Sequence, residues 1–493
     1  MSQIIVDTTG TVRDSGGHTH AQGEVWQQQK LAAYLAGETI DKYQLLDDAY
    51  RASGGFENGT YLIPHPSEGI AKYIRRKKMC YYVNYVKPIV DALVNPIFRT
   101  DPIRSGMGRF FEEFTKDVDG NGTTLTRFMK KAAIRAKLHG VEFIVIDMQP
   151  VEEDEVLTEK RIIEERIYPY VYLVSPSQIT DWATNKFGKL VSISYTLTNC
   201  IIDNEGKALS KEEVWTWTET KCKKTVDGIE TTFENQIGII PVVPLYGAIN
   251  DSADLIPNSD VMAISRTNLA LFNACSELRE RNSQQAFSLL TYPIADDDTY
   301  EEATEGITIG TADMLMYRAS TGNAPEFITP PPDSSDMLLN EIQFMVKEIY
   351  RMASLRMTTD SNTYNVSAVA MRIMNQQYYQ SITELAHGLQ EAEKKLNKIF
   401  SLYMGDRNSE FEVSYNQEYS SPDPAEVLNS ATTSLALGMT PEFNKEMRKQ
   451  VAKAVLEGVG TSIISSVLDS IEKSSDSGEA LEGEATVVQP VRN

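Results

Sequence analysis

Residues 367–404 read SAVAMRIMNQQYYQSITELAHGLQEAEKKLNKIFSLYM. Apolar side chains recur along this stretch in alternating steps of four and three, which is the spacing of one face of an α-helix. The members of the stripe are Tyr378, Ile382, Leu385, Leu389, Ala392, Leu396, Ile399 and Tyr403. At 1.5 Å per residue, a single helix over the whole stretch would be about 57 Å long. Helices of compact domains usually have three or four turns, so the sequence predicts an unusually long α-helix.

Two further helices are predicted upstream, over 259–290 and 334–355. Both carry apolar stripes but have little other core nearby in the sequence, so we expect them to pack on each other and on a neighbouring copy of the chain. A head-to-tail contact of this kind can close into a ring. Residues 291–332 between the two helices are predicted to be irregular and end in a triple proline, which has no backbone donors.

The remaining segments predict an α+β fold that is mainly α, with a β-rich region at 150–250. Further helices are predicted over 24–51 (two short ones), 67–99 with a kink at Pro88, 125–139, 424–437 and from Thr440 onward. Strands are predicted at 142–147, 168–174, 191–197, 215–218, 239–246 and 411–415. The runs at 168–174 and 239–246 contain proline, which places them near a sheet edge or bend. Residues 151–166 are predicted to form a solvated hairpin or loop, 1–23 a flexible arm and 474–493 a disordered acidic tail.

Composition excludes several classes of protein. The 493 residues include 69 Asp or Glu and 47 Lys or Arg, which gives a formal charge of −22. Tight binding of nucleic acid depends on Lys and Arg that neutralise phosphates, so the acidity argues against a protein that grips DNA or RNA. Four cysteines without a CxxC pair are too few for a disulfide scaffold. No apolar stretch reaches 18 residues, so no transmembrane helix is expected.

No catalytic or cofactor motif is complete. Asp117-x-Asp119-x-Asn121-Gly122 matches the first half of a calcium loop, but the twelfth position is Phe128 instead of the bidentate Glu. A turn that caps the following helix is therefore favoured. The sequence has no Walker phosphate loop, no GxSxG elbow and no Cys/His zinc spacing. We therefore predict a protein without catalytic residues, metal or cofactor.

Two charged clusters stand out. The run Arg75-Arg76-Lys77-Lys78 could contact phosphate, but pairing with acidic neighbours is favoured in so acidic a chain. An acidic cluster falls in the irregular segment and consists of Asp296, Asp297, Asp298, Glu301 and Glu302. Such a cluster is usually a solvated loop, yet it could also dock a basic partner.

The order of these elements resembles the portal proteins of tailed bacteriophages, over roughly residues 30–460. A helical and β-rich part leads to a helix, an irregular acidic excursion, a second helix, a polar loop and a very long helix. Local similarity is found at YYVNYVKPIVDALVNPIF (81–98), DVDGNGTTLTRFMKKAAIRAKLHGVEFIVID (117–147), PSQITDW (176–182), IPVV (240–243), 268–293 and VSAVAM (366–371). The last stretch has Ala368 where the family commonly has glycine.

This resemblance implies a wing, stem, clip and crown architecture in a ring of about twelve copies. By position, the wing is 24–257, the stem helices are 258–290 and 333–355, the clip is 291–332, the tunnel loop is 356–366, the long wing helix with a wing strand is 367–439, and the crown is 440–473. The ring would be a channel for double-stranded DNA packaging and ejection at one capsid vertex of the virion, assembled in the host cytoplasm. The implied partners are the terminase large subunit, the major capsid or scaffold protein, and neck or adaptor proteins, with no membrane. The acidic cluster at 296–302 would dock the motor and later the neck.

Electrostatics are compatible with a bore through which DNA slides. Phosphate contacts raise DNA affinity steeply, so an acidic or neutral lumen with polar loops keeps contacts weak and independent of sequence. We predict that Asp360, Asn362, Tyr364 and Asn365 face the DNA at the narrowest part of the bore. The alternative is a surface loop between two helices.

Two other functions are compatible with the sequence. One is another non-enzymatic virion protein, such as a head-completion factor. The other is a metal-dependent hydrolase using Asp/Glu chemistry, with Asp117, Asp119 and Asn121 as candidate ligands. Calcium or manganese binding would distinguish the second, and we expect none.

Overall fold

The structure is a computed structural model that describes the following parts of the chain. The described residues are 40–65, 68–149, 158–202, 208–250, 254–285, 289–294, 314–318, 326–328, 333–355, 376–405, 410–416, 440–456 and 461–473, with the short pieces 5–6, 12–13, 19–20, 419, 429 and 433. Residues 1–417 and 418–493 form two compact units. Within the described residues, no helix is long and apolar enough to span a membrane.

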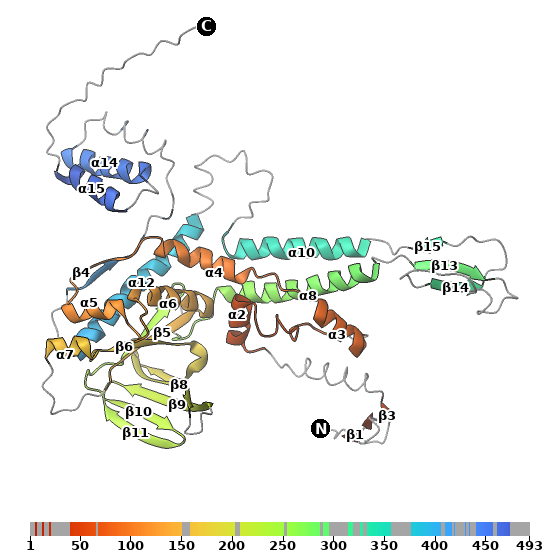
Figure 1. The fold of residues 1–493 in the computed structure, drawn as a ribbon, viewed down its shortest axis with the longest axis horizontal. Coiled ribbons are helices and arrows are strands. Elements are labelled where there is room, and N and C mark those ends of the chain that lie inside the picture. Colours follow the sequence, from red (N-terminus) through yellow and green to blue (C-terminus); the bar gives the residue numbers. More distant parts are fainter. Residues whose placement is uncertain are drawn as a thin grey trace, which may run out of the picture. The chain divides into compact units, whose positions relative to one another are not determined.

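Five helices form the centre of the first unit (Figure 1). They are α2 (Lys42–Arg51), α4 (Val86–Val94), α6 (Leu125–His139), α8 (Val261–Gln285) and α12 (Gln376–Tyr403). Helix α4 contacts the other four, and its residues Val86, Val90 and Val94, spaced by four, are fully buried. Burial of one such side chain contributes roughly 1.5–3 kcal/mol, so α4 is central to the packing of this group.

The long helix is confirmed from Gln376 onward as α12, whose 28 residues span about 42 Å. Its stripe is buried at Ile382, Leu385, Leu389 and Leu396. The first part of the predicted helix, 367–375, lies outside the described residues.

Smaller elements pack beside α12. They are the 3-10 helix η1 (Asn95–Phe98), β4 (Ile103–Ser105), α5 (Arg109–Lys116) and β16 (Glu412–Ser414). The predicted alternation at 411–415 is confirmed, because β16 pairs with β4, and Phe411, Val413 and Tyr415 in and beside this strand are buried.

The predicted helix over 67–99 is wrong in one respect, because the chain forms α3 (Ile70–Met79) and α4 with a non-helical segment at 80–85 between them. Pro88 does not kink a helix. It is the third residue of α4, where a backbone N–H has no acceptor within the helix, so proline costs no hydrogen bond.

A three-stranded antiparallel sheet lies against α6 and α12. Its central strand is β5 (Val141–Asp147), flanked by β12 (Val242–Tyr246) and β6 (Tyr170–Val174). The chain passes from α6 into β5 through Gly140, whose φ of 93° favours glycine. The two proline-containing runs form the edge strands of this sheet, as predicted, with Pro244 inside β12.

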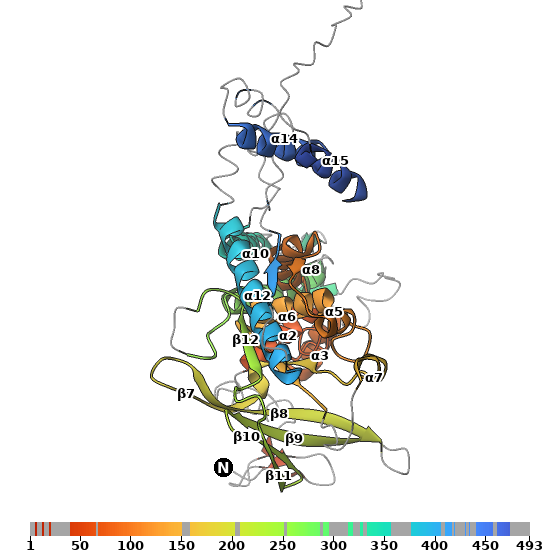
Figure 2. The same ribbon diagram turned by 90° about the vertical axis from the view of Figure 1, so that its left-hand side faces the viewer.

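A second antiparallel sheet has the strand order β11–β10–β9–β8–β7 and forms a separate layer (Figure 2). Its strands are β7 (Ile179–Thr184), β8 (Leu190–Ile202), β9 (Ala208–Thr218), β10 (Lys221–Val226) and β11 (Ile229–Glu234). The 3-10 helix η2 (Pro176–Gln178) precedes β7. Tyr195 and Trp217 share one buried cluster with Val141 and Phe143 of β5, so the two sheets have a common core. The predicted strands at 191–197 and 215–218 are confirmed.

Helix α8 packs against α10 (Asp333–Met352), and the two run antiparallel from a small sheet at one end (Figure 1). That sheet contains β13 (Leu289–Ile294), β14 (Met314–Arg318) and β15 (Glu326–Ile328). Strand β13 pairs parallel to β14 and antiparallel to β15. The prediction that 291–332 is irregular is therefore wrong at these strands. Apolar runs as short as LLTYPI and MLMYR do not reveal a period.

Part of the predicted loop over 151–166 is a short helix, α7 (Glu159–Glu164). The Thr158 hydroxyl caps it by accepting a hydrogen bond from the Arg161 N–H at 3.4 Å. Arg161 also pairs with Glu165 at 2.8 Å, so local interactions support this polar helix.

The second unit contains α14 (Pro441–Val455) and α15 (Thr461–Lys473), which pack against each other. Thr440 is the N-cap and Pro441 the first helical residue, as predicted. The predicted helix at 424–437, apart from residues 429 and 433, and the tail 474–493 lie outside the described residues. In the N-terminal arm the described residues are the paired strands β1 (Ile5–Val6), β2 (Val12–Arg13) and β3 (Thr19–His20).

Candidate functional site

The pair formed by α8 and α10, here called the hairpin, is anchored to the rest of the unit through Asn268. The side-chain oxygen of this buried residue accepts hydrogen bonds from the Tyr82 hydroxyl at 2.9 Å and the Tyr85 N–H at 3.1 Å. Its amide donates to the Val83 carbonyl at 3.0 Å. These bonds replace helical ones at 82–85, which explains why the chain is not helical between α3 and α4.

Helix α10 carries apolar side chains on the face that packs against α8 and also on its exposed faces. The stripe toward α8 contains Leu338, Ile342, Met345, Ile349 and Met352. Outside it, Met337 is 73% exposed and Phe344 is 63% exposed, and these two stand seven residues apart on one flank. Leu339, 44% exposed, lies on the opposite flank. We call Met337, Glu341 and Phe344 the α10 flank.

The basic run at 75–78 divides into two parts. Arg76 is buried and forms a bidentate ion pair with Glu68 at 2.7 and 2.9 Å, so acidic pairing is confirmed for this residue. Arg75 and Lys78 are exposed, and neither pairs with a carboxylate among the described residues. The side chain of Arg75 instead donates to the Ser283 hydroxyl of α8 at 3.0 Å.

Apolar side chains accompany these free cations. Ile74 of α3 is 48% exposed, and Tyr81 is 47% exposed beside Arg279 of α8, with 5.6 Å between the guanidinium carbon and the ring centroid. We call Ile74, Arg75, Lys78 and Tyr81 the α3 surface. It lies along α8 and combines positive charge with exposed apolar area.

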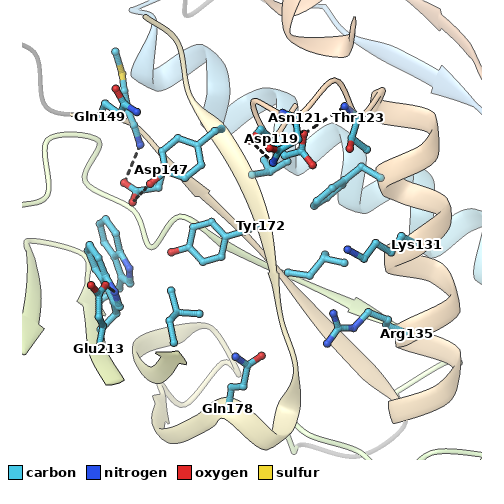
Figure 3. Close-up of a pocket in the computed structure, with 18 of the residues that line it drawn as sticks. Asp119, Asn121, Thr123, Lys131, Arg135, Asp147, Gln149, Tyr172, Gln178 and Glu213 are labelled. Carbon is cyan, nitrogen blue, oxygen red and sulfur yellow. Dashed lines mark hydrogen bonds between the residues drawn. The ribbon is translucent and has the colours of Figure 1, made fainter. Parts of the chain in front are cut away.

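A cleft of about 1920 Å³ opens between α6 and the sheets (Figure 3). Its α6 wall is basic and carries Arg127, Lys130, Lys131 and Arg135. Asp147 and Glu213 lie across from Lys131 and Arg135, with Tyr172 between the two sides (Figure 3). The basic α6 wall thus faces two carboxylates, one of which is paired with Lys224.

Asp147, Glu213 and Cys222 in the described part of the cleft are buried or engaged by neighbouring side chains. Asp147 accepts hydrogen bonds from the Met148 N–H at 2.8 Å and the Tyr170 hydroxyl at 3.0 Å, while burial raises its pKa. Glu213 is paired with Lys224 at 2.9 Å. Burial raises the pKa of Cys222 to about 12, which keeps the thiol neutral and poorly nucleophilic at neutral pH. No histidine occurs among the described lining residues.

The incomplete calcium motif forms a closed turn. Asp117 accepts hydrogen bonds from the N–H groups of Gly120 and Gly122 at 2.8 and 3.0 Å, and its other oxygen pairs with Arg166 at 3.3 Å. Asp119 accepts from the Asn121 N–H at 2.9 Å. Burial disfavours the charged form of Asp119, but hydrogen bonds from Asn121 and Thr123 outweigh it and lower the pKa.

The favoured interpretation as a turn is therefore confirmed, although Thr124 and not an aspartate caps α6. Among the described residues there is no group of three or more His, Cys, Asp or Glu side chains that could hold a metal ion.

The residues predicted to face DNA or to dock the motor lie outside the described residues. This holds for the loop residues Asp360, Asn362, Tyr364 and Asn365 and for the acidic cluster Asp296, Asp297, Asp298, Glu301 and Glu302. Sequence reasoning singled out the basic run of the α3 surface but not its combination with Ile74 and Tyr81, and it missed the α10 flank and the cleft. One signal for the flank was available, because Met337 and Phe344 are apolar positions that the main stripe of α10 leaves out.

No protein-family model and no curated protein matches the chain. Several solved structures are similar at low TM-score. The neck of an empty gene transfer agent particle has 11% identity, covers 86% of this chain and 98% of its own, and gives a TM-score of 0.39. The virion of a native gene transfer agent particle has 13% identity, with 87% and 98% covered and a TM-score of 0.38. An HK97-family phage portal protein from Corynebacterium diphtheriae has 11% identity, with 70% and 94% covered and a TM-score of 0.32.

Proposed function

We propose that this chain is a structural, ring-forming portal of a tailed phage. In this proposal the ring is a channel for packaging and ejecting double-stranded DNA at one capsid vertex. The hairpin is the stem, the small sheet of β13–β15 belongs to the clip, and α14 and α15 form the crown. The chain performs no catalysis, and the packaging motor is a separate partner.

The observation that carries the proposal is the unfinished packing of the hairpin. Helix α10 buries one stripe against α8 but exposes Met337 and Phe344 on one flank and Leu339 on the other. Exposed apolar side chains on two sides of a helix favour burial against other molecules. Two unlike surfaces on one chain support head-to-tail contacts, and such contacts close into a ring when the rotation between copies allows it.

Charge supports the passage of DNA through such a ring. Each copy carries a formal charge of −22, so the assembly repels a polyanion overall. Weak contacts let DNA slide, whereas many phosphate contacts would hold it. In the proposal Asp360, Asn362, Tyr364 and Asn365 face the DNA at the narrowest point.

The partners follow from this position in a virion. The acidic cluster Asp296, Asp297, Asp298, Glu301 and Glu302 would dock the terminase large subunit during packaging and neck or adaptor proteins afterwards, through complementary basic surfaces. The capsid or scaffold protein would bind elsewhere on the ring. Assembly in the host cytoplasm is part of the same proposal.

Particle mass and shape test the proposal directly. A ring of about twelve copies of a 55.1 kDa chain has a mass of roughly 660 kDa. We expect light scattering to report a mass of this order and negative-stain images to show particles with a central hole. Solitary 55 kDa globules without a hole would overturn the proposal. Specific binding of calcium or manganese by the protein would instead favour a metal-dependent enzyme.

A further inference from the structure

We infer that the α3 surface of one copy binds the α10 flank of the next copy. This inference rests on the proposed ring and names the residues that would join its subunits. The α3 surface is Ile74, Arg75, Lys78 and Tyr81, and the α10 flank is Met337, Glu341 and Phe344. The occupant of each surface is thus a second copy of this chain.

The two surfaces are complementary in chemistry. Ile74 and Tyr81 expose about half of their side chains, and Met337 and Phe344 expose more than half. Arg75 and Lys78 are positive, Glu341 is negative, and none of these three has an ion-pair partner among the described residues. Contact between the surfaces would bury apolar area on both and place opposite charges together.

The α3 surface is continuous along α8. Arg75 donates to Ser283, and Tyr81 stacks with Arg279. Positions 279 and 283 are one helical turn apart, so both ends of the surface lie over the same part of α8.

Tyr85 shows which parts of α8 and α10 are level with each other. Its N–H donates to Asn268 of α8 at 3.1 Å, and its ring lies 6.0 Å from that of Tyr350 of α10. Both helices rise about 1.5 Å per residue in opposite directions. Counting thirteen residues forward from Asn268 gives position 281, and counting thirteen back from Tyr350 gives Met337, so these two positions are level. Counting six residues in the same way places position 274 level with Phe344.

Met337, at one end of the α10 flank, therefore lies level with the part of α8 that carries the α3 surface, and the flank continues from there to Phe344. In the proposed ring the axis runs along the hairpin, so rotation about it would leave this level unchanged and neighbouring copies would present Met337 and the α3 surface to each other at equal height. Helices α3 and α10 each pack on α8 from different sides (Figure 1). The contact would thus join unlike surfaces of two copies, as a head-to-tail ring requires.

A nucleic acid is the rival occupant of the α3 surface because of its cations. Two observations favour protein. Ile74 and Tyr81 add apolar area that phosphate does not use, and Arg75 already donates to Ser283. DNA binding lost in Lys78→Glu while assembly is unchanged would overturn the inference in favour of this rival.

Charge reversal tests the contact. Lys78→Glu and Glu341→Lys each place like charges at the proposed interface, and the double variant restores opposite charges. We expect each single variant to raise the protein concentration at which half of the assemblies dissociate by about tenfold or more. In the double variant this concentration should return most of the way to the wild-type value. Lys395→Glu and Glu391→Lys, exposed on α12, are matched controls and should leave the concentration unchanged.

Crosslinking gives a second measurement that does not depend on assembly strength. Ile74→Cys combined with Met337→Cys, oxidised with copper phenanthroline in air, should give a ladder of covalent multimers on non-reducing gels, because Met337 is the flank residue level with the α3 surface. Either single variant should give only the background of the native cysteines. The contact is overturned, and the proposed portal left intact, if the wild-type ring forms, neither charge reversal changes its assembly, and no covalent multimers appear. A wild-type chain that never assembles overturns both.

Discussion

Arg104 and Glu393 form a bidentate ion pair although 289 positions separate them in the sequence. The distances are 2.5 Å from Nε to Oε1 and 3.2 Å from Nη2 to Oε2. Glu393 has no exposed side-chain surface, and the Tyr415 hydroxyl also donates to it, at 2.6 Å. The pair joins β4 to α12, and Tyr415 brings in the segment after β16. One carboxylate thus connects three distant segments of the chain.

Replacing this carboxylate should destabilise the protein strongly. Glu393→Gln leaves the Arg104 guanidinium buried without its counter-charge, which typically costs about 3–5 kcal/mol. Urea unfolding at fixed protein concentration measures the loss. The exposed pair of Lys394 and Glu412, at 2.6 Å, provides the control, since Glu412→Gln should cost at most about 1 kcal/mol. Equal effects of the two variants would show that the buried pair has no special role.

His139 should make stability depend on pH. It is 1% exposed, with Nε2 3.3 Å from Asp47 and Nδ1 3.4 Å from Glu142. Burial lowers its pKa, but its hydrogen bonds to Asp47 and Glu142 outweigh this and raise the pKa above 6.5. Folding therefore favours the protonated ring. The stabilisation is fully present below the unfolded pKa of about 6.5 and is lost as pH rises through the higher folded pKa.

The variant His139→Gln tests this dependence because glutamine does not titrate. We expect the decline in unfolding free energy above pH 6.5 to disappear in that variant. His387→Gln, on the exposed side of α12, is the control and should keep the decline. An unchanged pH profile in His139→Gln would contradict the assignment.

Periodicity predicted the elements whose burial is regular. The stripe of α12 and the alternation of Phe411, Val413 and Tyr415 are one-sided patterns, and each was confirmed. The prediction failed at Pro88, because the position of proline within a helix depends on where the helix begins. That start is set by Asn268, which lies far along the chain and carries no local signal.

The candidate surfaces were harder to predict for a related reason. Arg75, Arg76 and Lys78 look equivalent in the sequence, yet only Arg76 is buried against Glu68. Which cations remain free depends on tertiary packing of α3 on α8. The cleft depends likewise on how α6 meets two sheets, and no single stretch of sequence encodes it.

The exposed apolar residues of α10 should matter for assembly more than for folding. Met337→Asp with Phe344→Asp removes apolar area that we expect neighbouring copies to bury, so particle mass by light scattering should fall below that of the wild type. Because both side chains are already exposed, far-UV circular dichroism should be unchanged. Phe187→Asp, 81% exposed at the turn between β7 and β8, is the control and should assemble normally.

Calcium should not bind at the turn of Asp117 and Asp119. Their oxygens already accept backbone N–H groups or pair with Arg166, and position 128 is a buried phenylalanine. Isothermal titration with Ca²⁺ or Mn²⁺ should give only heats of dilution. Asp119→Asn should lower stability by about 1 kcal/mol through a weakened turn. Saturable heat that disappears in Asp119→Asn would revive the metal-dependent alternative.

The segment 359–365 should act on DNA and not on assembly. It contains Asp360, Asn362, Tyr364 and Asn365, polar side chains predicted to contact DNA weakly in the bore. Replacing the segment with an equal length of Gly and Ser keeps the connection between α10 and α12 but removes these side chains. We expect rings of normal mass in electron micrographs, together with reduced packaging or poor retention of DNA measured as nuclease-resistant genome per particle. A matched replacement in the turn 185–188 should leave both properties unchanged. Normal packaging with the 359–365 segment replaced would place the narrowest part of the bore elsewhere, because an unstructured Gly-Ser segment cannot reproduce contacts made by specific side chains.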